Sequence, residues 1–341
     1  MKVLVTGGAG YIGNIVVRKL LAKGHTVRVL DWLIFGDDSL TDLKDQIELV
    51  KGDIRTIRPK VLDNIDAVIH LAGFSTEPTS QYDPRLTDLI NHIATENVAK
   101  LARAKGVKRF IYASSCSVYF ALNTPLDPPL YTESDFVNPI SCYSLTKRCA
   151  EQVLWGMTND DFQPTVFRKG TLYGFSSRMR YDLVFNSFTK DAFLKKVLTV
   201  DAAGEIWRPM IDIQDAADAY VKCLELPLDK VGGKMFNISG ENWKIGDLAV
   251  LIKKTLKKKG ITLTLDIKPY GVTRNYKADN SQFKEIFNFK PSRSMEKVML
   301  EIWDHLEDSK HNPQADYYYN DVWYKKFFDT SRGKRFKKQS L

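Results

Sequence analysis

The chain has 341 residues, of which 44% are hydrophobic and 27% are charged, a composition typical of a globular protein with room for about two domains. Its net charge of +9 depends on the last ten residues, RGKRFKKQSL, which hold five basic residues and no acidic one, so nine minus five leaves +4 for the rest. A basic tail in solvent explains this charge without a nucleic-acid partner, which would need a basic stripe within the fold.

Two further sequence features exclude other classes of protein. The apolar runs are shorter than the roughly 18 residues of a membrane span, and MKVLVTGG enters a strand pattern without a cationic leader. We therefore expect a cytoplasmic protein that makes no membrane contact. The four cysteines show no CxxC spacing, so we predict neither a metal site nor a disulfide framework.

Strand-like and helix-like runs alternate through the first half of the chain. Short β-branched runs predict strands at 3–6, 26–31, 47–50, 67–71 and 110–114, and helical periodicity predicts helices at 12–22 and 86–104. A helix at about 144–155 and a strand at 165–168 continue the pattern. This alternation predicts an α/β fold with a doubly wound parallel sheet. After Gly174 the pattern loosens, which favours a smaller second domain over the carboxyl ends of the strands.

The run TGGAGYIG lies between the first strand and the first helix. It places Gly7, Gly10 and Gly13 where a tight turn must let a pyrophosphate approach the helix N-terminus. Asp31 ends the next strand, 18 residues after Gly13. A carboxylate there accepts hydrogen bonds from the adenosine ribose and repels a 2′-phosphate, so the sequence favours NAD over NADP. Ile54, with its neighbour Asp53, either flanks the adenine or forms an ordinary turn.

Tyr143 and Lys147, in CYSLTKRCAE, are four residues apart on one face of the predicted helix. A phenol is a poor base at its reference pKa of about 10. A neighbouring ammonium and an oxidised nicotinamide both favour phenolate and so lower that pKa. Tyr143 can then accept the proton of a substrate hydroxyl while hydride leaves the same carbon.

These motifs occur together, in order, with HLAG at 70–73 and IYASSCSVY at 111–119. The set resembles the extended short-chain dehydrogenase/reductase family, and most closely its NAD-dependent nucleotide-sugar epimerases and dehydratases, over roughly residues 1–305. The resemblance implies a Rossmann-type domain at 1–170 with returns at about 208–240. It also implies a smaller, discontinuous α/β nucleotide-sugar domain at 171–207 and 241–310, leaving 311–341 as a C-terminal extension with a basic tail.

The resemblance also implies roles for individual residues. Ser115 matches the residue that hydrogen-bonds the reacting hydroxyl, Tyr143 matches the base and Lys147 its partner. Asn91 matches an asparagine that holds the sheet near the active site. The expected cofactor-binding residues are Gly7, Gly10, Tyr11, Ile12, Gly13, Asp31, Asp53, Ile54, Leu71, Ala72, Gly73, Asn91, Tyr143 and Lys147.

The second half of the chain resembles the family more weakly. Arg208 and Arg274 match arginines that grip the nucleotide diphosphate, as a planar guanidinium suits phosphate. Arg178, Arg180 and Asn186 lie in or near SSRMRYDL, which resembles a branch that includes nucleotide-heptose 4-dehydrogenases. We expect these five residues, with Ser117, to bind the nucleotide sugar; the alternative for any one arginine is a solvated surface residue.

Cys116 and Ser117 distinguish between the reactions of the family. In its 4,6-dehydratases the equivalents of these residues are acidic, and one donates a proton to the departing hydroxyl. A thiol and a neutral hydroxyl are poor replacements, and a decarboxylase of the family carries a glutamate at the Ser117 position. For Cys116 itself, the role of a small hydrophobe is the preferred interpretation.

The sequence therefore predicts NAD-dependent oxidation at C4 of a nucleotide-diphospho sugar, most simply by a 4-epimerase. The alternatives are a 4-dehydrogenase that releases the keto sugar and a protein that binds NAD without turnover. The helices beginning near Leu86 and Ser144 match those of the family's dimer interface, so we expect a homodimer.

Overall fold

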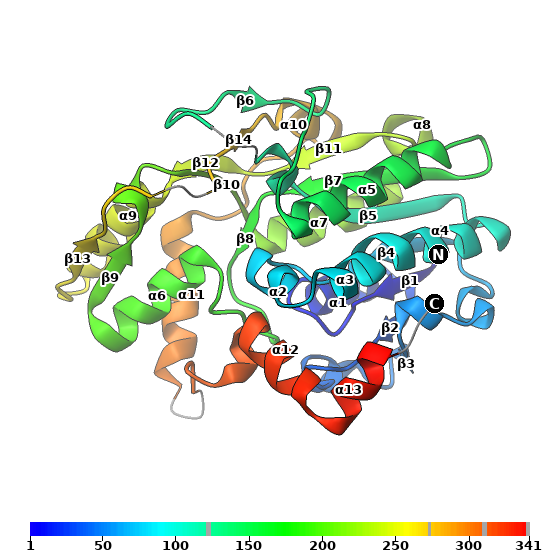
Figure 1. Cartoon of the computed structure of the whole chain (residues 1–341), viewed down its shortest axis with the longest axis horizontal. Coiled ribbons are helices and arrows are strands. Elements are labelled where there is room, and N and C mark those ends of the chain that lie inside the picture. The colour runs from blue at the N-terminus through cyan, green and yellow to red at the C-terminus, as the bar shows by residue number, and fades with distance from the viewer. Residues whose placement is uncertain (121–123, 272–273, 309–311, 339–341) are drawn as a thin grey trace.

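The computed structural model describes residues 1–120, 124–271, 274–308 and 312–338. Within them the largest sheet has seven parallel strands in the order β11-β7-β5-β4-β1-β2-β3 (Figure 1). The strands are β1 Lys2–Thr6, β2 Thr26–Asp31, β3 Ile47–Lys51, β4 Ala67–His70, β5 Arg109–Ser115, β7 Gln163–Lys169 and β11 Met235–Ile238. The predicted doubly wound α/β fold is confirmed.

Side chains alternate between the two faces of this sheet, as the pleat requires. Val3 and Val5 belong to the hydrophobic cluster on one face, and Leu4 belongs to the cluster on the other. The first face is covered by helices α1 Gly13–Ala22 and α7 Ile213–Glu225, and the second by α4 Ala94–Ala104 and α5 Cys142–Gly156. The inner strands are thus buried on both faces, whereas the edge strand β3 has only half-buried and exposed residues.

The predicted helix at 86–104 is interrupted. It consists of α3 Pro84–Asp88, a π-helical turn at Leu89–Ile93, and α4. A π-helical turn inserts a residue into the helix and re-aims the side chains beside it. Asn91 lies in this turn, and its side chain bonds the backbone of Phe74. The sequence did not reveal the interruption, because helical periodicity survives on either side of it.

The smaller region forms three short sheets over the carboxyl ends of the main strands. They are made of β8 Thr171–Tyr173 with β10 Trp207–Asp212 and β12 Glu241–Lys244, β9 Val197–Val200 with β13 Thr264–Ile267, and β6 Leu130–Tyr131 with β14 Lys277–Ala278. The segment 208–240, expected to return to the Rossmann-type domain, is therefore divided. Strand β10 belongs to a small sheet, whereas β11 is a strand of the large sheet and α7 packs against that sheet. The remaining helices here are α6 Val184–Lys195, α8 Leu228–Val231, α9 Ile245–Lys258, α10 Ser281–Phe287 and α11 Met295–Glu307.

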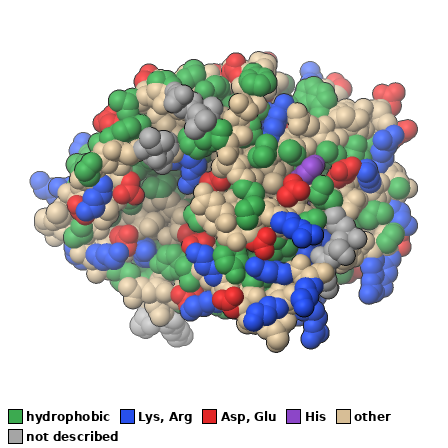
Figure 2. All heavy atoms as spheres, in the orientation of Figure 1, with side chains coloured by type: hydrophobic (Ala, Val, Ile, Leu, Met, Phe, Trp, Pro, Cys, Tyr) green, Lys and Arg blue, Asp and Glu red, His purple; other side chains and the backbone are tan. Residues whose placement is uncertain are grey.

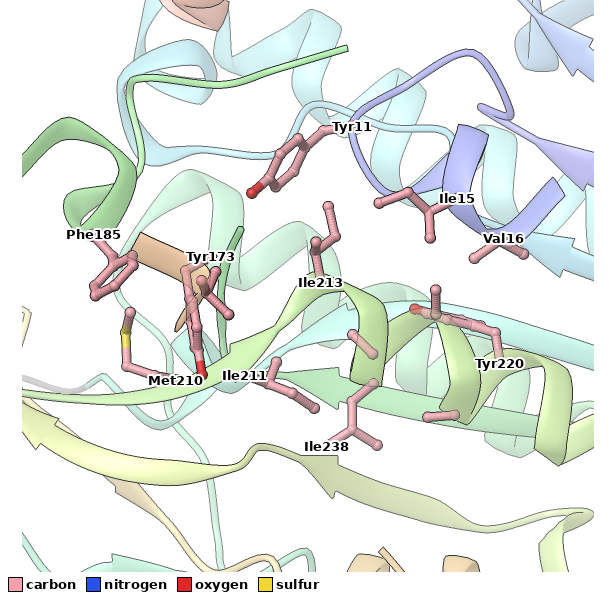
Figure 3. Close-up of a cluster of buried hydrophobic side chains, with 14 of the residues drawn as sticks. Tyr11, Ile15, Val16, Tyr173, Phe185, Met210, Ile211, Ile213, Tyr220 and Ile238 are labelled. Atoms are coloured by element: carbon pink, nitrogen blue, oxygen red, sulfur yellow. The ribbon is translucent and has the colours of Figure 1, made fainter. Parts of the chain in front are cut away.

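One continuous core joins the two regions. Figure 3 shows side chains of α1, α6, α7, β8, β10 and β11 in a single buried cluster. The cluster includes Tyr11 of the glycine turn, Ile213 and Tyr173. The smaller region is therefore packed onto the larger one through apolar contact. None of the described helices is long and apolar enough to cross a membrane.

The C-terminal extension folds back onto the large sheet's side of the molecule (Figure 1). Helix α12 Asn320–Asp329 buries Tyr324 and Phe328 against helix α2 Glu77–Tyr82 and Phe74, and α13 Ser331–Lys338 follows it. Figure 2 shows Lys and Arg side chains gathered over α13 at the lower edge of that face. The expected basic tail forms a helix that packs through Phe336 on Trp32 and pairs Lys337 with Asp83, while its other basic side chains, Arg332, Lys334, Arg335 and Lys338, are exposed to solvent as expected.

Candidate active site

A cavity of about 710 Å³ lies across the carboxyl edge of the large sheet. Its walls include the glycine turn, the ends of β2, β4, β5 and β7, and residues of α6, β10 and α12 on the opposite side. A ligand at the carboxyl ends of parallel strands is the rule for open α/β sheets. The volume is within the usual range for small-molecule sites.

The glycine turn leaves no room for side chains. Gly7 has a φ of +74°, and a Cβ on Gly13 would lie 2.1 Å from the Gly7 carbonyl oxygen. Tyr11 holds the turn to the second half of the chain, because its hydroxyl donates to the Gly174 carbonyl at 2.6 Å and accepts from the Asn186 amide at 2.9 Å. The turn, Tyr11 and Ile12 all line the cavity, as expected for a pyrophosphate site.

Asp31 occupies the position that the sequence assigned to ribose recognition. Its carboxylate lines the cavity and accepts hydrogen bonds from the backbone N–H of Ala9 (3.0 Å) and of Leu33 (2.8 Å). Burial raises the pKa of Asp31, and these two hydrogen bonds oppose that shift. The carboxylate is thereby held in one orientation beside the cavity.

The other cofactor residues divide into those on the cavity wall and those behind it. Ile54, Leu71, Ala72 and Gly73 are on the wall. Asp53 is not on the wall, and its carboxylate accepts a hydrogen bond from the guanidinium of Arg55 at 2.7 Å. Asn91 is also behind the wall: its oxygen accepts from the Phe74 N–H and its amide donates to the Phe74 carbonyl. Its placement fits a brace of the loop after β4.

Ser115 and Tyr143 meet at the end of β5. Both line the cavity, and a hydrogen bond from Ser115 opposes the strong rise that burial causes in the pKa of Tyr143. Lys147 lies further from the cavity, with its Nζ donating to the Ala113 carbonyl at 2.8 Å and 5.9 Å from the Tyr143 ring centroid. Burial lowers the pKa of Lys147 well below its usual value. Ser115 and Tyr143 therefore lie together on the wall with Lys147 behind it, and the lowering of the Tyr143 pKa expected from a neighbouring ammonium is outweighed by burial.

Ser117 and Cys116 are buried but differ in surroundings. The Ser117 hydroxyl has no hydrogen-bond partner among the described residues and lines the cavity. The Cys116 thiol is turned away and donates to the Arg168 carbonyl at 3.1 Å, and burial raises its pKa far above the usual value. This placement fits the packing role for Cys116.

The arginines expected to bind the sugar nucleotide lie at two ends of the cavity. Arg208 and Arg274 share one end, where the Arg208 guanidinium donates, among the described residues, to the Trp207 and Arg274 carbonyls alone and lies 5.2 Å from the Tyr276 ring. Arg178 is at the other end, 3.7 Å above the Phe35 ring, and its charge acts on Asp31. Contact with the cofactor is thus the simpler role for Arg178.

Arg180 and Asn186 are committed to protein partners. Arg180 lines the cavity but pairs with Asp182 at 2.8 Å and donates to Ser75 at 3.2 Å. Asn186 is fully buried and not on the wall, with its side chain bonded to Gly174, Tyr11 and Arg180. Asn186 therefore shapes the site rather than touching a ligand.

Three wall residues of the C-terminal extension were missed by sequence reasoning. Asn320, Asp321 and Tyr324 line the cavity near Asp31, and Asn320 accepts a hydrogen bond from Arg178 at 2.7 Å. The neighbouring Trp323 donates its indole N–H to the Ile34 carbonyl at 2.9 Å. The aromatic density of YYYNDVWYKKFF was the signal for a buried segment.

A family model of the NAD-dependent epimerase/dehydratase family matches residues 3–239 of this chain. The chain belongs to that family. Among its curated relatives, UDP-glucose 4-epimerase of Lactobacillus helveticus is 28% identical over 89% of this chain and 96% of its own length. UDP-glucuronic acid decarboxylase 1 of Xenopus tropicalis is 29% identical over 64% of this chain and 52% of its own.

Solved structures agree with this assignment. The UDP-glucuronic acid 4-epimerase from Bacillus cereus, in complex with UDP-glucuronic acid and NAD, superposes with a TM-score of 0.79 at 25% identity, over 90% of this chain and 99% of that one. NAD is the cofactor of the family, and the glycine turn and Asp31 fit it. It supplies a reversible acceptor for hydride, while the chain's own residues orient the substrate and move its proton.

Proposed function

We propose that the protein is an NAD-dependent 4-epimerase of a nucleotide-diphospho sugar, with UDP as the nucleotide. The observation that carries this proposal is the pairing of Ser115 and Tyr143 on the wall with the neutral side chains at 116 and 117. Tyr143 would take the proton of the 4-hydroxyl as hydride leaves C4, and Ser115 would hold the same oxygen. The keto sugar would turn over and recover hydride on its other face.

Elimination of water has little support in the residues around the cavity. It needs an acid to protonate the leaving hydroxyl and a base beside the ketone. Asp212 and Glu133, the two carboxylates considered as replacements for the missing pair, do not line the cavity. Asp212 pairs with Arg293 at 2.7 Å, and Glu133 accepts from the Asn237 N–H. We infer that neither takes part in the reaction.

A 4-dehydrogenase that releases its keto sugar is the second candidate, because SSRMRYDL resembles such enzymes. That enzyme must exchange its reduced cofactor after each turnover. Here Arg178, Asn320 and Tyr324 line the Asp31 end of the cavity, which favours retention of the cofactor. An epimerase returns its hydride and needs no exchange, so the arrangement supports epimerisation.

The test is incubation with UDP-sugars, with NADH absorbance and the product's mass and stereochemistry followed together. Epimerisation leaves the mass unchanged and produces no lasting NADH. A product lighter by two hydrogens, with NADH formed, would establish the dehydrogenase instead. Loss of water would contradict the roles given to Cys116 and Ser117, and no turnover of any UDP-sugar would leave a binding protein.

We also propose a homodimer formed through α4 and α5. Helix α5 exposes two large apolar side chains, Leu145 (50% exposed) and Trp155 (58% exposed), and a second copy would bury them. Light scattering at micromolar concentration should give the mass of a dimer, and Leu145→Glu should give a monomer. A monomeric wild type would contradict the proposal.

A further inference from the structure

Lys169 is a cation of the cavity that the sequence did not single out. It is the last residue of β7, and its Cα partner on the neighbouring strand β5 is Ser115. It lines the same cavity as Ser115 and Tyr143. Adjacent strands lie about 4.8 Å apart, so the lysine side chain can reach a group next to the carbon whose hydroxyl Ser115 and Tyr143 hold.

Lys169 is half-buried, and like Arg274 its side chain has no protein partner among the described residues, unlike three other cations of the site. Arg180 pairs with Asp182, Arg178 donates to Asn320, and Lys147 donates to the Ala113 carbonyl. For the Lys169 ammonium, the described part of the chain provides neither a hydrogen-bond acceptor nor a carboxylate at ion-pair distance. Burial lowers its pKa to about 8. An ammonium in such a place is costly unless a ligand supplies an anion.

The diphosphate of a sugar nucleotide has other partners. Arg208 and Arg274 line the far end of the cavity and form no ion pair among the described residues. Two guanidinium groups suffice for two phosphate charges. Lys169 is therefore left with no role in binding the diphosphate.

We propose that Lys169 binds a carboxylate on the sugar ring, and that the substrate is an acidic nucleotide sugar. The proposal rests on the function proposed above. Since Lys169 lies beside the residues that hold the 4-hydroxyl, the carboxylate belongs on C5, the neighbouring carbon. The unpartnered Ser117 hydroxyl and the nearby wall residue Thr171 can donate hydrogen bonds to the same group.

The test compares two sugars that differ in this one group. Binding of UDP, UDP-glucose and UDP-glucuronic acid is measured by calorimetry on the NAD-loaded wild type, Lys169→Met, Lys169→Arg and Arg208→Met. The wild type should bind UDP-glucuronic acid at least tenfold more tightly than UDP-glucose. Lys169→Met should weaken the acidic sugar about 10- to 100-fold and the neutral sugar less than threefold, as for loss of one charge-assisted bond.

The other two variants separate the roles of the two cations. Lys169→Arg should keep much of the preference, because it keeps the charge. Arg208→Met should weaken UDP and both sugars by the same factor, since all three carry the diphosphate. Removal of an unpaired buried ammonium should not lower the melting temperature of Lys169→Met, which checks that the variant is folded.

Each failure has a separate meaning. Equal affinity of the wild type for the two sugars would overturn the role of Lys169, and so would equal weakening of both sugars by Lys169→Met. If UDP still binds in either case, the proposed function is not contradicted. A wild type that binds no UDP at all would overturn both proposals.

Discussion

The two ends of the cavity differ in how completely their polar groups are satisfied by the protein. At the Asp31 end, both charged groups have partners, since the carboxylate has two backbone donors and Arg178 donates to Asn320; the Arg178 Nε and the Trp32 indole N–H have none among the described residues. At the sugar end, Arg208 bonds only carbonyls, and Lys169 and the Ser117 hydroxyl lack partners among the described residues. Polar groups that have protein partners are held in place before a ligand binds, whereas groups without protein partners need the ligand to supply a hydrogen-bond or charge partner. Cofactor choice is therefore built into the fold, and substrate choice depends on the charges that the substrate supplies.

The point where the two ends meet should give the largest effect. Tyr143→Phe removes the proton acceptor and almost no volume, so kcat should fall about 10²- to 10⁴-fold. NAD content after gel filtration should match that of the wild type, because the Asp31 end is unchanged. Ser115→Ala is a useful companion, since it removes the partner hydroxyl alone. Turnover within threefold of wild type would remove Tyr143 from the mechanism.

A change at Asp31 should alter cofactor choice without altering sugar choice. Asp31→Asn keeps an acceptor oxygen but removes the charge that repels a 2′-phosphate. Because a like-charge contact costs several kcal/mol, we expect the preference for NAD over NADP to fall about 10- to 100-fold. The ratio of the two dissociation constants measures it. An unchanged ratio would mean that Asp31 only holds the backbone of the loop that follows β2.

The sugar end should respond to pH where the Asp31 end does not. The pKa of Lys169 is lowered to about 8 by burial, so its ammonium is charged below pH 8 and neutral above it. The ratio of kcat/KM for UDP-glucuronic acid to that for UDP-glucose should be constant below pH 8 and fall by at most about tenfold per unit above it.

Two groups near Lys169 do not interfere with this test. Arg180 stays charged, because its pKa is raised, and burial keeps the Cys116 thiol neutral. Titration of Tyr143 affects both sugars and cancels in the ratio. A ratio that is flat to pH 10 would exclude Lys169 from carboxylate binding.

The smallest effect concerns the C-terminal extension. Trp323→Phe removes the indole hydrogen bond to Ile34 but keeps an aromatic ring, a loss of about 1 kcal/mol, or up to roughly fivefold in the Kd for NAD. Trp303→Phe is the matched control, because its indole donates to Glu307 at 2.8 Å and it does not line the cavity. The same change in NAD affinity for both variants would show that α12 does not support the cofactor site.

Local sequence determined much of this protein. The glycine turn, the strands and Asp31 were predicted because each depends on neighbours within a few residues: glycines for a tight turn, alternation for a sheet buried on both faces. Tyr143 and Lys147 were predicted because four residues separate side chains on one face of a helix. The cofactor end was thus largely evident from sequence.

Tertiary structure alone decided the rest. Arg178 lies at the Asp31 end because Phe35 and Asn320, each more than 140 residues from Arg178 in the chain, meet around it. Lys169 stands out only when Arg178, Arg180 and Lys147 are matched with their partners, and those partners come from separate elements. The α12 helix reaches the cavity because Phe35 and Phe74 offer it an aromatic surface. Such contacts depend on which elements pack together, and no local pattern carries that information.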